Sequence, residues 1–90
     1  MRERDVEKYL TAQVKYLGGR SYKWSSPSHR GVPDRLVFFP NVVFAVEVKA
    51  KGKVPTKLQS HEHRVLGCLG FKVVVVDDKD SIDKLLKDFT

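Results

Sequence analysis

The stretch RLVFFPNVVFAVEVKA (residues 35–50) holds two apolar runs on either side of Pro40-Asn41. β-branched and aromatic residues fill both runs, and Pro followed by Asn is typical of a turn. The stretch therefore predicts an antiparallel hairpin with strands over 35–39 and 42–50. Because both strands are so apolar, we expect them inside a sheet rather than at its edge.

Charged side chains interrupt the second strand near its end. Side chains alternate along a strand, so Glu47 and Lys49 point to one face while Val46 and Val48 point to the other. Asp34 precedes the first strand, and the hairpin brings it to within a pair or so of Glu47. We therefore expect two carboxylates and an ammonium to converge on one face of the sheet.

Periodic patterns on both sides of the hairpin complete the fold. The expected helices cover residues 2–17, 57–69 and 81–89, and two further strands cover 21–24 and 71–76. The last strand follows a crossover helix, which favours parallel pairing with the strand before that helix. The fold class is α/β, in the order αβββαβα: a mixed sheet flanked by helices, forming a single domain over residues 1–90.

The second helix is expected to begin after Thr56, a favourable N-cap residue, and to end at Gly70. Its expected inner face carries the apolar residues Leu58, Val65, Leu66 and Leu69. Cys68 lies in the same helix and is expected to be a small core residue. As the only cysteine, it excludes an internal disulfide and a cysteine-based zinc cluster.

The charge of the chain favours a polyanionic partner. Seventeen Lys and Arg against eleven Asp and Glu give a net charge of +6 and an isoelectric point near 9.6. Such an excess suits nucleic acid, or less well an acidic membrane surface. The sequence shows neither a signal peptide nor an apolar run long enough to span a membrane, so we expect a cytoplasmic protein, associated with the nucleoid or in the cytoplasm of a host cell.

The converging charges point to metal-dependent phosphate chemistry. Neighbouring buried carboxylates raise each other's pKa, and a divalent cation relieves that cost. Mg²⁺ prefers oxygen ligands, which Asp34, Glu47 and the carbonyl of Val48 can supply together with a substrate phosphate. Lys49 can then position or deprotonate the attacking water and offset charge at the phosphorus. The alternative is a turn aspartate beside an ordinary strand ion pair.

Three motifs together resemble one known family. GVPDR (residues 31–35), EVK (47–49) and TKLQ (56–59) are similar to those of the VRR-NUC family, a branch of the PD-(D/E)xK nuclease superfamily. The resemblance covers nearly the whole chain, and the superfamily core has the element order expected above. It implies Mg²⁺-dependent hydrolysis of DNA, with Mn²⁺ as a substitute, by metal ligands Asp34 and Glu47 and the catalytic Lys49.

The family also places a glutamate on the first helix, and two residues compete for that role. The family spacing has apolar residues three and seven positions after the glutamate, which Glu3 satisfies with Val6 and Leu10. Helical phase also favours Glu3 over Glu7 as a further metal-site residue. Either can instead be an ordinary first-turn glutamate that favours the helix dipole.

Other polar residues are assigned by their position around this site. Gln59 matches the glutamine of the family motif and could orient Lys49 or a water molecule, or could simply be solvated. The residues expected to contact the DNA backbone are Lys23, Ser26 and Arg30 on one side and Lys51, Lys53 and Lys57 on the other. Singly, each is more often a solvated side chain, but two basic segments flanking one acidic site indicate a groove.

The remaining histidines and aromatic residues give weaker signals. His61 and His63 lie two positions apart on a helix and make a poor metal pair. His29 could contact DNA or nothing. Tyr22 and Trp24 are expected to pack rather than to stack on bases.

These observations favour a Mg²⁺-dependent, structure-specific DNA endonuclease that cuts four-way junctions, because small members of the family resemble Holliday-junction resolvases. Symmetric incision of a junction needs two active sites, which implies a homodimer. The alternatives are a restriction-like, flap or nicking endonuclease, and a non-catalytic basic module that binds nucleic acid.

Overall fold

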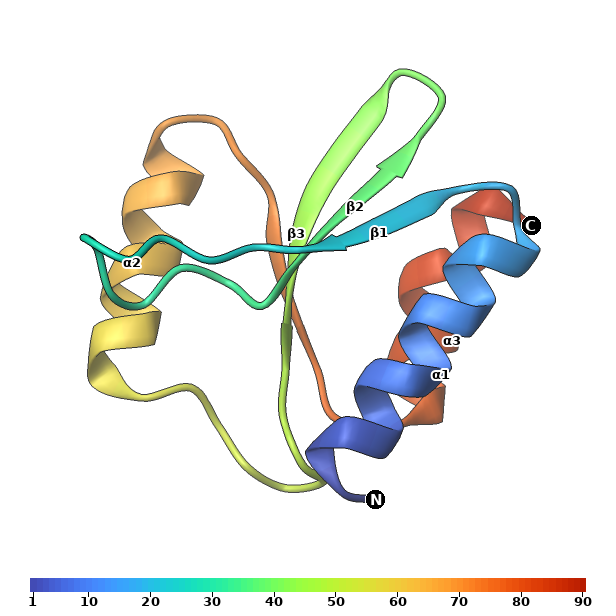
Figure 1. The fold of residues 1–90 in the computed structure, drawn as a ribbon, viewed down its shortest axis with the longest axis horizontal. Coiled ribbons are helices and arrows are strands. Elements are labelled where there is room, and N and C mark those ends of the chain that lie inside the picture. The colour runs from blue at the N-terminus through green and yellow to red at the C-terminus, as the bar shows by residue number, and fades with distance from the viewer.

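The expected order of helices and strands is observed in the computed structural model, which describes residues 1–90 (Figure 1). The elements are α1 (Glu3–Tyr16), β1 (Arg20–Lys23), β2 (Arg35–Phe39), β3 (Val42–Val48), α2 (Lys57–Cys68), β4 (Val73–Val76), α3 (Lys79–Leu86) and a 3₁₀ turn, Lys87–Phe89. β3 ends at Val48 instead of residue 50, and β4 begins at Val73 instead of residue 71. The last helix continues as the 3₁₀ turn, and it begins at Lys79 instead of residue 81. The reason is a cap: the Asp78 carboxylate accepts a hydrogen bond from the Ser81 backbone N–H at 2.8 Å.

The four strands form one mixed sheet in the order β1-β2-β3-β4. β2 pairs antiparallel with β1 and β3, and β3 pairs parallel with β4. The two apolar strands of the hairpin are therefore central, as predicted. Asn41 lies in the turn between them with φ 61°, a left-handed conformation that Asn tolerates well.

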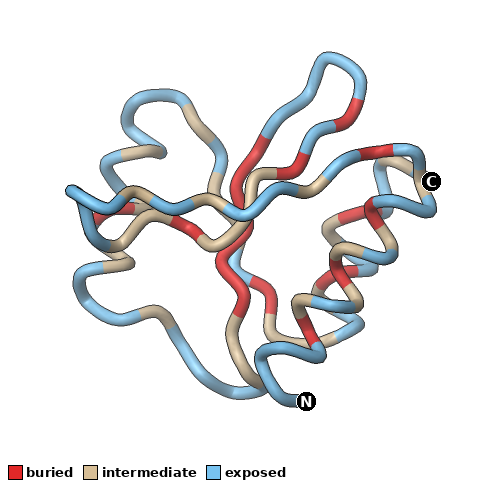
Figure 2. The backbone as a smooth tube through the Cα atoms, in the orientation of Figure 1, coloured by how far each residue is buried: buried red, intermediate tan, exposed pale blue.

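Helices cover both faces of the sheet, with α1 and α3 on one side and α2 on the other (Figure 1). The hydrophobic core lies on the α1 and α3 side, where the buried segments of the central strands meet the inner faces of those helices (Figure 2). Its buried residues are Val6, Leu10, Val14, Val37, Phe39, Phe44, Val46, Val48, Val76, Ile82 and Leu86. Burying a side chain of this size contributes ~1.5–3 kcal/mol. None of the helices combines the length and apolar character needed to cross a membrane.

The prediction for the inner face of α2 was wrong. Leu58, Val65 and Leu69 are 50%, 38% and 77% exposed, and Cys68 is exposed as well. The only buried residue of α2 is Glu62. The sheet presents polar side chains beneath the first half of α2, so the polar face of the helix turns inward. Of the four predicted apolar residues only Leu66 is half-buried, and the other three are exposed.

Gly19, just before β1, lies where the backbone passes very close to the neighbouring strand β2. A Cβ atom there would lie 2.7 Å from the backbone oxygen of Phe38 and 2.7 Å from the ring of Phe39. We expect Gly19→Ala to lower the free energy of unfolding by ~1–3 kcal/mol, because backbone cannot move aside as a side chain can.

Urea unfolding measures this effect against a matched glycine. Gly67 lies within α2, and a Cβ atom there would meet nothing within 4 Å. Gly67→Ala is therefore expected to stabilise the protein by up to ~1 kcal/mol through helix propensity. Equal midpoints for the two variants would contradict the close approach at Gly19.

Candidate active site

The register of the hairpin brings Asp34 and Glu47 together. The last pair of the β2–β3 ladder is Arg35 with Val46, so Asp34 and Glu47 fall at the next position, as the sequence predicts. The Asp34 carboxylate accepts a hydrogen bond from the Val48 backbone N–H at 2.8 Å. Asp34 is thus fixed to the same strand that carries Glu47.

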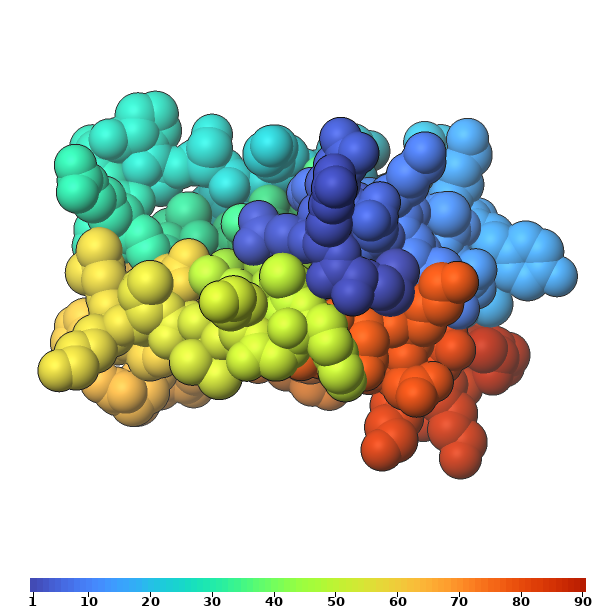
Figure 3. Space-filling view, turned by 90° about the horizontal axis from the view of Figure 1, so that it is seen from below, coloured from blue at the N-terminus to red at the C-terminus, as the bar shows by residue number.

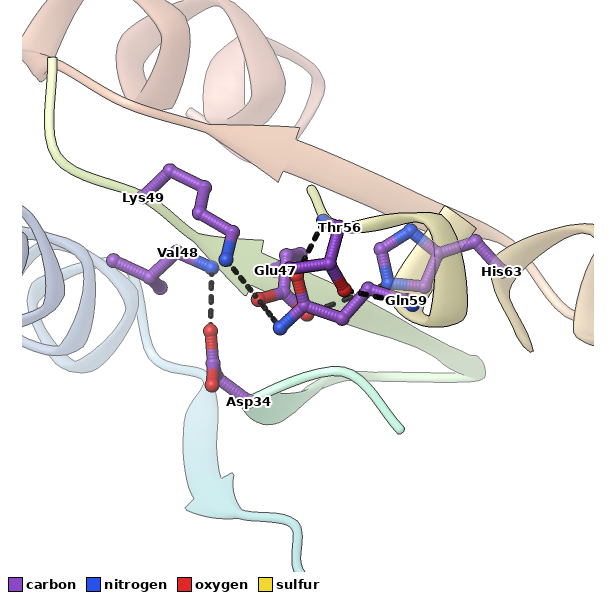
Figure 4. A network of polar contacts seen from close by, with 7 residues as sticks. All are labelled: Asp34, Glu47, Val48, Lys49, Thr56, Gln59 and His63. Carbon is purple, nitrogen blue, oxygen red and sulfur yellow. Dashed lines mark hydrogen bonds and ion pairs between the residues drawn. The ribbon is translucent and has the colours of Figure 1, made fainter. Parts of the chain in front are cut away.

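Three side chains surround the buried carboxyl group of Glu47, which is 1% exposed (Figure 4). Gln59 of α2 donates through Nε2 to Oε2 of Glu47 at 3.2 Å. His63, one turn later on α2, places its Nε2 3.3 Å from the other oxygen, Oε1. The Nζ atom of Lys49 lies 3.6 Å from Oε2, on the same face as Glu47.

The N-cap of α2 fixes the orientation of Gln59. Thr56 accepts a hydrogen bond from the Gln59 backbone N–H at 3.2 Å, and the Gln59 side-chain oxygen accepts one from the Thr56 N–H at 2.9 Å. This reciprocal pair is a capping box. Because the amide oxygen is used by Thr56, the amide nitrogen is the group that faces Glu47. A helix-start signal in the sequence therefore also positions a side chain of the site.

The electrostatics of the site favour a protonated Glu47 in the absence of a cation. Burial, and then the neighbouring Asp34 charge, raise the pKa of Glu47 to about 8, although Lys49 acts in the opposite direction. Burial also lowers the pKa of His63. At neutral pH the contact between Glu47 and His63 is then a hydrogen bond between largely neutral groups rather than an ion pair, despite its short distance.

The oxygen atoms around Asp34 fit a hard divalent cation. An N–H and a C=O of one strand residue point to the same neighbouring strand, so the Val48 carbonyl faces the side from which Asp34 binds the Val48 N–H. The β2–β3 ladder ends at the pair of Arg35 and Val46, two residues before Val48. No three His, Cys, Asp or Glu side chains converge as a metal cluster. Mg²⁺ needs only one or two carboxylates besides carbonyl, water and phosphate oxygens.

The six residues expected to contact DNA lie on two segments that flank these carboxylates. Lys23, Ser26 and Arg30 are at the end of β1 and in the loop that leads to Asp34, and Lys51, Lys53 and Lys57 are in and just after the loop that follows β3. All the basic side chains in this set are exposed. Lys51 is paired with Asp78 and holds the pKa of that carboxyl at about 2, so a phosphate would have to compete for it.

The two candidate glutamates of α1 are used differently. Glu7 binds the Arg35 guanidinium at 3.2 Å, on the α1 side of the sheet, away from Glu47. Glu3 is exposed at the tip of α1, which lies against the segment after β3: the Lys51 N–H donates to the Met1 carbonyl at 3.2 Å (Figure 3). Glu3 makes no polar contact with Asp34 or Glu47, and its role in the site stays a prediction.

His63 is a site residue that the sequence reasoning missed. That reasoning compared His63 with His61, which does not share its face of the helix. The useful signal was the spacing of Gln59 and His63, four residues apart and hence on one face of α2. His29 was also left without a role, and it lies 2.6 Å from the Glu62 carboxylate.

Comparison with known proteins identifies relatives of the chain in sequence and in fold. No family model matches the sequence. The chain is 49% identical over 82 residues to the protein described as "Putative nuclease p44" of Acyrthosiphon pisum secondary endosymbiont phage 1, covering 89% of this chain and 87% of that protein. A solved structure described as "VRR_NUC domain" superposes with a TM-score of 0.89 at 33% identity, covering 98% of this chain and 97% of that one. The chain therefore belongs to the VRR_NUC family of nuclease domains.

Proposed function

We propose that the protein is a Mg²⁺-dependent endonuclease that hydrolyses phosphodiester bonds in DNA, with Mn²⁺ as a substitute metal and a four-way junction as its preferred substrate. The observation that carries this proposal is the buried Glu47 beside Asp34, with the Lys49 ammonium on the same face. A pair of carboxylates in this environment is unfavourable unless a cation binds. Membership of a nuclease family supports the same chemistry.

Each residue of the site has a separate role in this proposal. Asp34, Glu47 and the Val48 carbonyl would hold the cation, which would supply Lewis-acid activation of a water nucleophile and neutralise phosphate charge. Lys49 contributes a positive charge where negative charge builds on the phosphate, and its N–H groups can orient the attacking water. Gln59 donates to Glu47, and His63 would donate to it once Glu47 is ionised, so that both keep its oxygens in place. Exposed basic residues on both sides would follow the DNA backbone.

A second copy of the chain would provide the second active site that symmetric incision requires. Apolar side chains remain uncovered on the α2 side of the sheet, beyond the end of the helix. Tyr22, Phe38 and Val43 are 56%, 38% and 42% exposed there, and the rings of Tyr22 and Phe38 are 5.8 Å apart. Exposed apolar patches of this kind favour protein contacts. Sedimentation equilibrium with and without junction DNA measures whether a homodimer forms.

A cleavage panel tests the proposed function. Four-way junction, flap, splayed-arm and linear duplex DNA are each incubated with Mg²⁺ and with Mn²⁺, and Asp34→Ala is the matched inactive variant. We expect cutting of the junction that Asp34→Ala abolishes, together with loss of Mg²⁺ binding by calorimetry. Preferred cutting of linear duplex would favour a restriction-like enzyme. Absence of both cutting and metal binding would leave a nucleic-acid-binding module.

His63→Ala is expected to weaken Mg²⁺ binding by ~10-fold or more, because partners that orient a metal ligand commonly contribute that much. With Glu47 ionised, the Nε2–H of His63 donates to Glu47 Oε1, and alanine removes this bond. Calorimetric titration with Mg²⁺ gives the affinity. His61→Ala is the matched control, since His61 is exposed two residues away on α2. Unchanged affinity in His63→Ala would remove His63 from the site.

A further inference from the structure

A second buried carboxylate lies outside the catalytic group. Glu62 is 9% exposed and is the only buried residue of α2. Its Oε1 atom lies 2.6 Å from Nε2 of His29, whose side chain is 62% exposed. A buried carboxylate is unfavourable unless it is hydrogen-bonded, so this single contact accounts for how Glu62 is tolerated.

His29 belongs to the loop of residues 24–34 that links β1 to β2. The loop is closed at its base by a hydrogen bond from the Trp24 N–H to the Asp34 carbonyl at 2.9 Å. Within it, the His29 N–H donates to the Ser26 carbonyl at 3.1 Å and forms a turn. In Figure 1 this loop, drawn from teal to green, crosses α2. The loop is compact and has hydrogen bonds of its own, and the contact between His29 and Glu62 attaches it to α2.

The backbone of the loop also touches α2 directly. Gly31 has φ +91°, and a Cβ atom there would lie 3.0 Å from the Leu58 carbonyl oxygen and 3.3 Å from Glu62 Cβ. The loop therefore meets α2 at two positions one turn apart. Only glycine combines this positive φ with so close an approach.

The helix α2 therefore contacts both the sheet and the 24–34 loop. Gln59 and His63 face Glu47 on the sheet, while Leu58 and Glu62 face the loop. The loop ends at Asp34, so the contact with Glu62 joins the segment that carries one carboxylate of the site to the helix that orients the other.

We propose that Glu62 and His29 are positioning residues that hold the 24–34 loop against α2 in the orientation that binds DNA. This inference rests on the proposed nuclease function, and it adds two residues that affect how tightly the DNA substrate binds. Ser26 and Arg30 lie on this loop, and Arg30 and His61 line a hollow of about 420 Å³ between the loop and α2. Because the loop is already fixed in one conformation, Ser26 and Arg30 can contact a DNA backbone without the entropy cost of ordering the loop on binding.

The kinetic test replaces Glu62 by methionine, which suits a buried position and lacks an oxygen acceptor. We expect KM for the DNA substrate to rise ~10-fold while kcat stays within ~2-fold, because a hydrogen bond to a charged group is lost from the loop and not from the reacting atoms. Glu62→Gln keeps an acceptor oxygen for His29 and is expected to restore most of the lost affinity. Asp88→Asn is the matched control, because Asp88 is an exposed carboxylate in the C-terminal 3₁₀ turn, outside the loop and α2.

A second measurement does not depend on activity. Trypsin can cut after Arg30, in the middle of the loop, only when the loop leaves α2. We expect Glu62→Met to raise the rate of this cut ~10-fold, and Glu62→Gln to keep it near that of the unmodified protein. His29→Ala combined with Glu62→Met should add little to either single change, since both remove one contact.

The outcomes separate this inference from the proposed function. If the unmodified protein cuts DNA, but Glu62→Met leaves both KM and protection of Arg30 unchanged, the positioning role is overturned and the nuclease stands. If the unmodified protein cuts no DNA, the nuclease proposal fails, while the trypsin rates still decide whether Glu62 holds the loop. A fall in kcat without a change in KM would show that Glu62 acts on the catalytic group and would also overturn the inference.

Discussion

Lys49→Ala is expected to slow DNA cleavage by ~10²-fold or more while leaving the fold, Mg²⁺ binding and DNA binding largely intact. Lys49 lies just after β3, with Nζ 3.6 Å from Glu47 Oε2 and a side chain only 14% exposed. The Lys49 side chain is therefore restricted to few rotamers, which keeps its charge at the site. The loss should appear in kcat, since the charge that Lys49 stabilises develops in the transition state.

Single-turnover cleavage of a labelled four-way junction measures this effect, with calorimetry for Mg²⁺ and a gel-shift titration for DNA. Lys53→Ala is the matched control, because Lys53 is an exposed lysine in the next loop. It should change KM and the salt dependence but not kcat. If Lys49→Ala cleaves at the rate of the unmodified protein, Lys49 has no part in the chemistry and another group must offset the phosphate charge.

In the absence of a divalent cation, the free energy of unfolding is expected to fall as the pH rises from about 4.5 to 8. The folded protein raises the pKa of Glu47 to about 8 from a usual value of 4.5, so in this range it keeps a proton that the unfolded chain releases. The stability gained from this proton is complete below the lower pKa and is lost as the pH rises through the upper one. For a carboxyl group so deeply buried, the total is on the order of a few kcal/mol.

Urea unfolding in a chelator between pH 5 and 9 tests this expectation, with Glu47→Gln as the isosteric neutral control. The variant should lose less stability across the range, because its amide has no proton to release. Mg²⁺ should reduce the loss in the unmodified protein and not in the variant, since only a carboxylate ligand gains from the cation. Parallel curves for the two proteins would mean that Glu47 is already ionised without metal.

The hairpin and the order of elements were predictable because they rest on local patterns. Apolar runs of β-branched and aromatic residues, the Pro40-Asn41 turn and Thr56 as an N-cap each act over a few residues, and all appear in the structure as expected. The pairing of Asp34 with Glu47 followed from the same turn, because a tight turn fixes the register. For these features no distant contact had to be known.

The inner face of α2 could not be predicted in the same way. Its apolar residues have helical spacing, but the spacing does not say which surface the helix will meet. The helix packs over Glu47 and beside the 24–34 loop, and both present polar groups, so Glu62 is buried while Leu58 and Leu69 are exposed. Cys68 is exposed for the same reason.

The sequence by itself determined the α/β order, the hairpin and the convergence of Asp34, Glu47 and Lys49, because hydrophobic period and turn chemistry are local properties. Only the tertiary structure decided what surrounds that group. His63 reaches Glu47, and His29 reaches Glu62 across 33 positions of sequence. Such contacts depend on how α2 and a loop meet after folding, and no local pattern encodes the distance between two segments that are far apart in the chain.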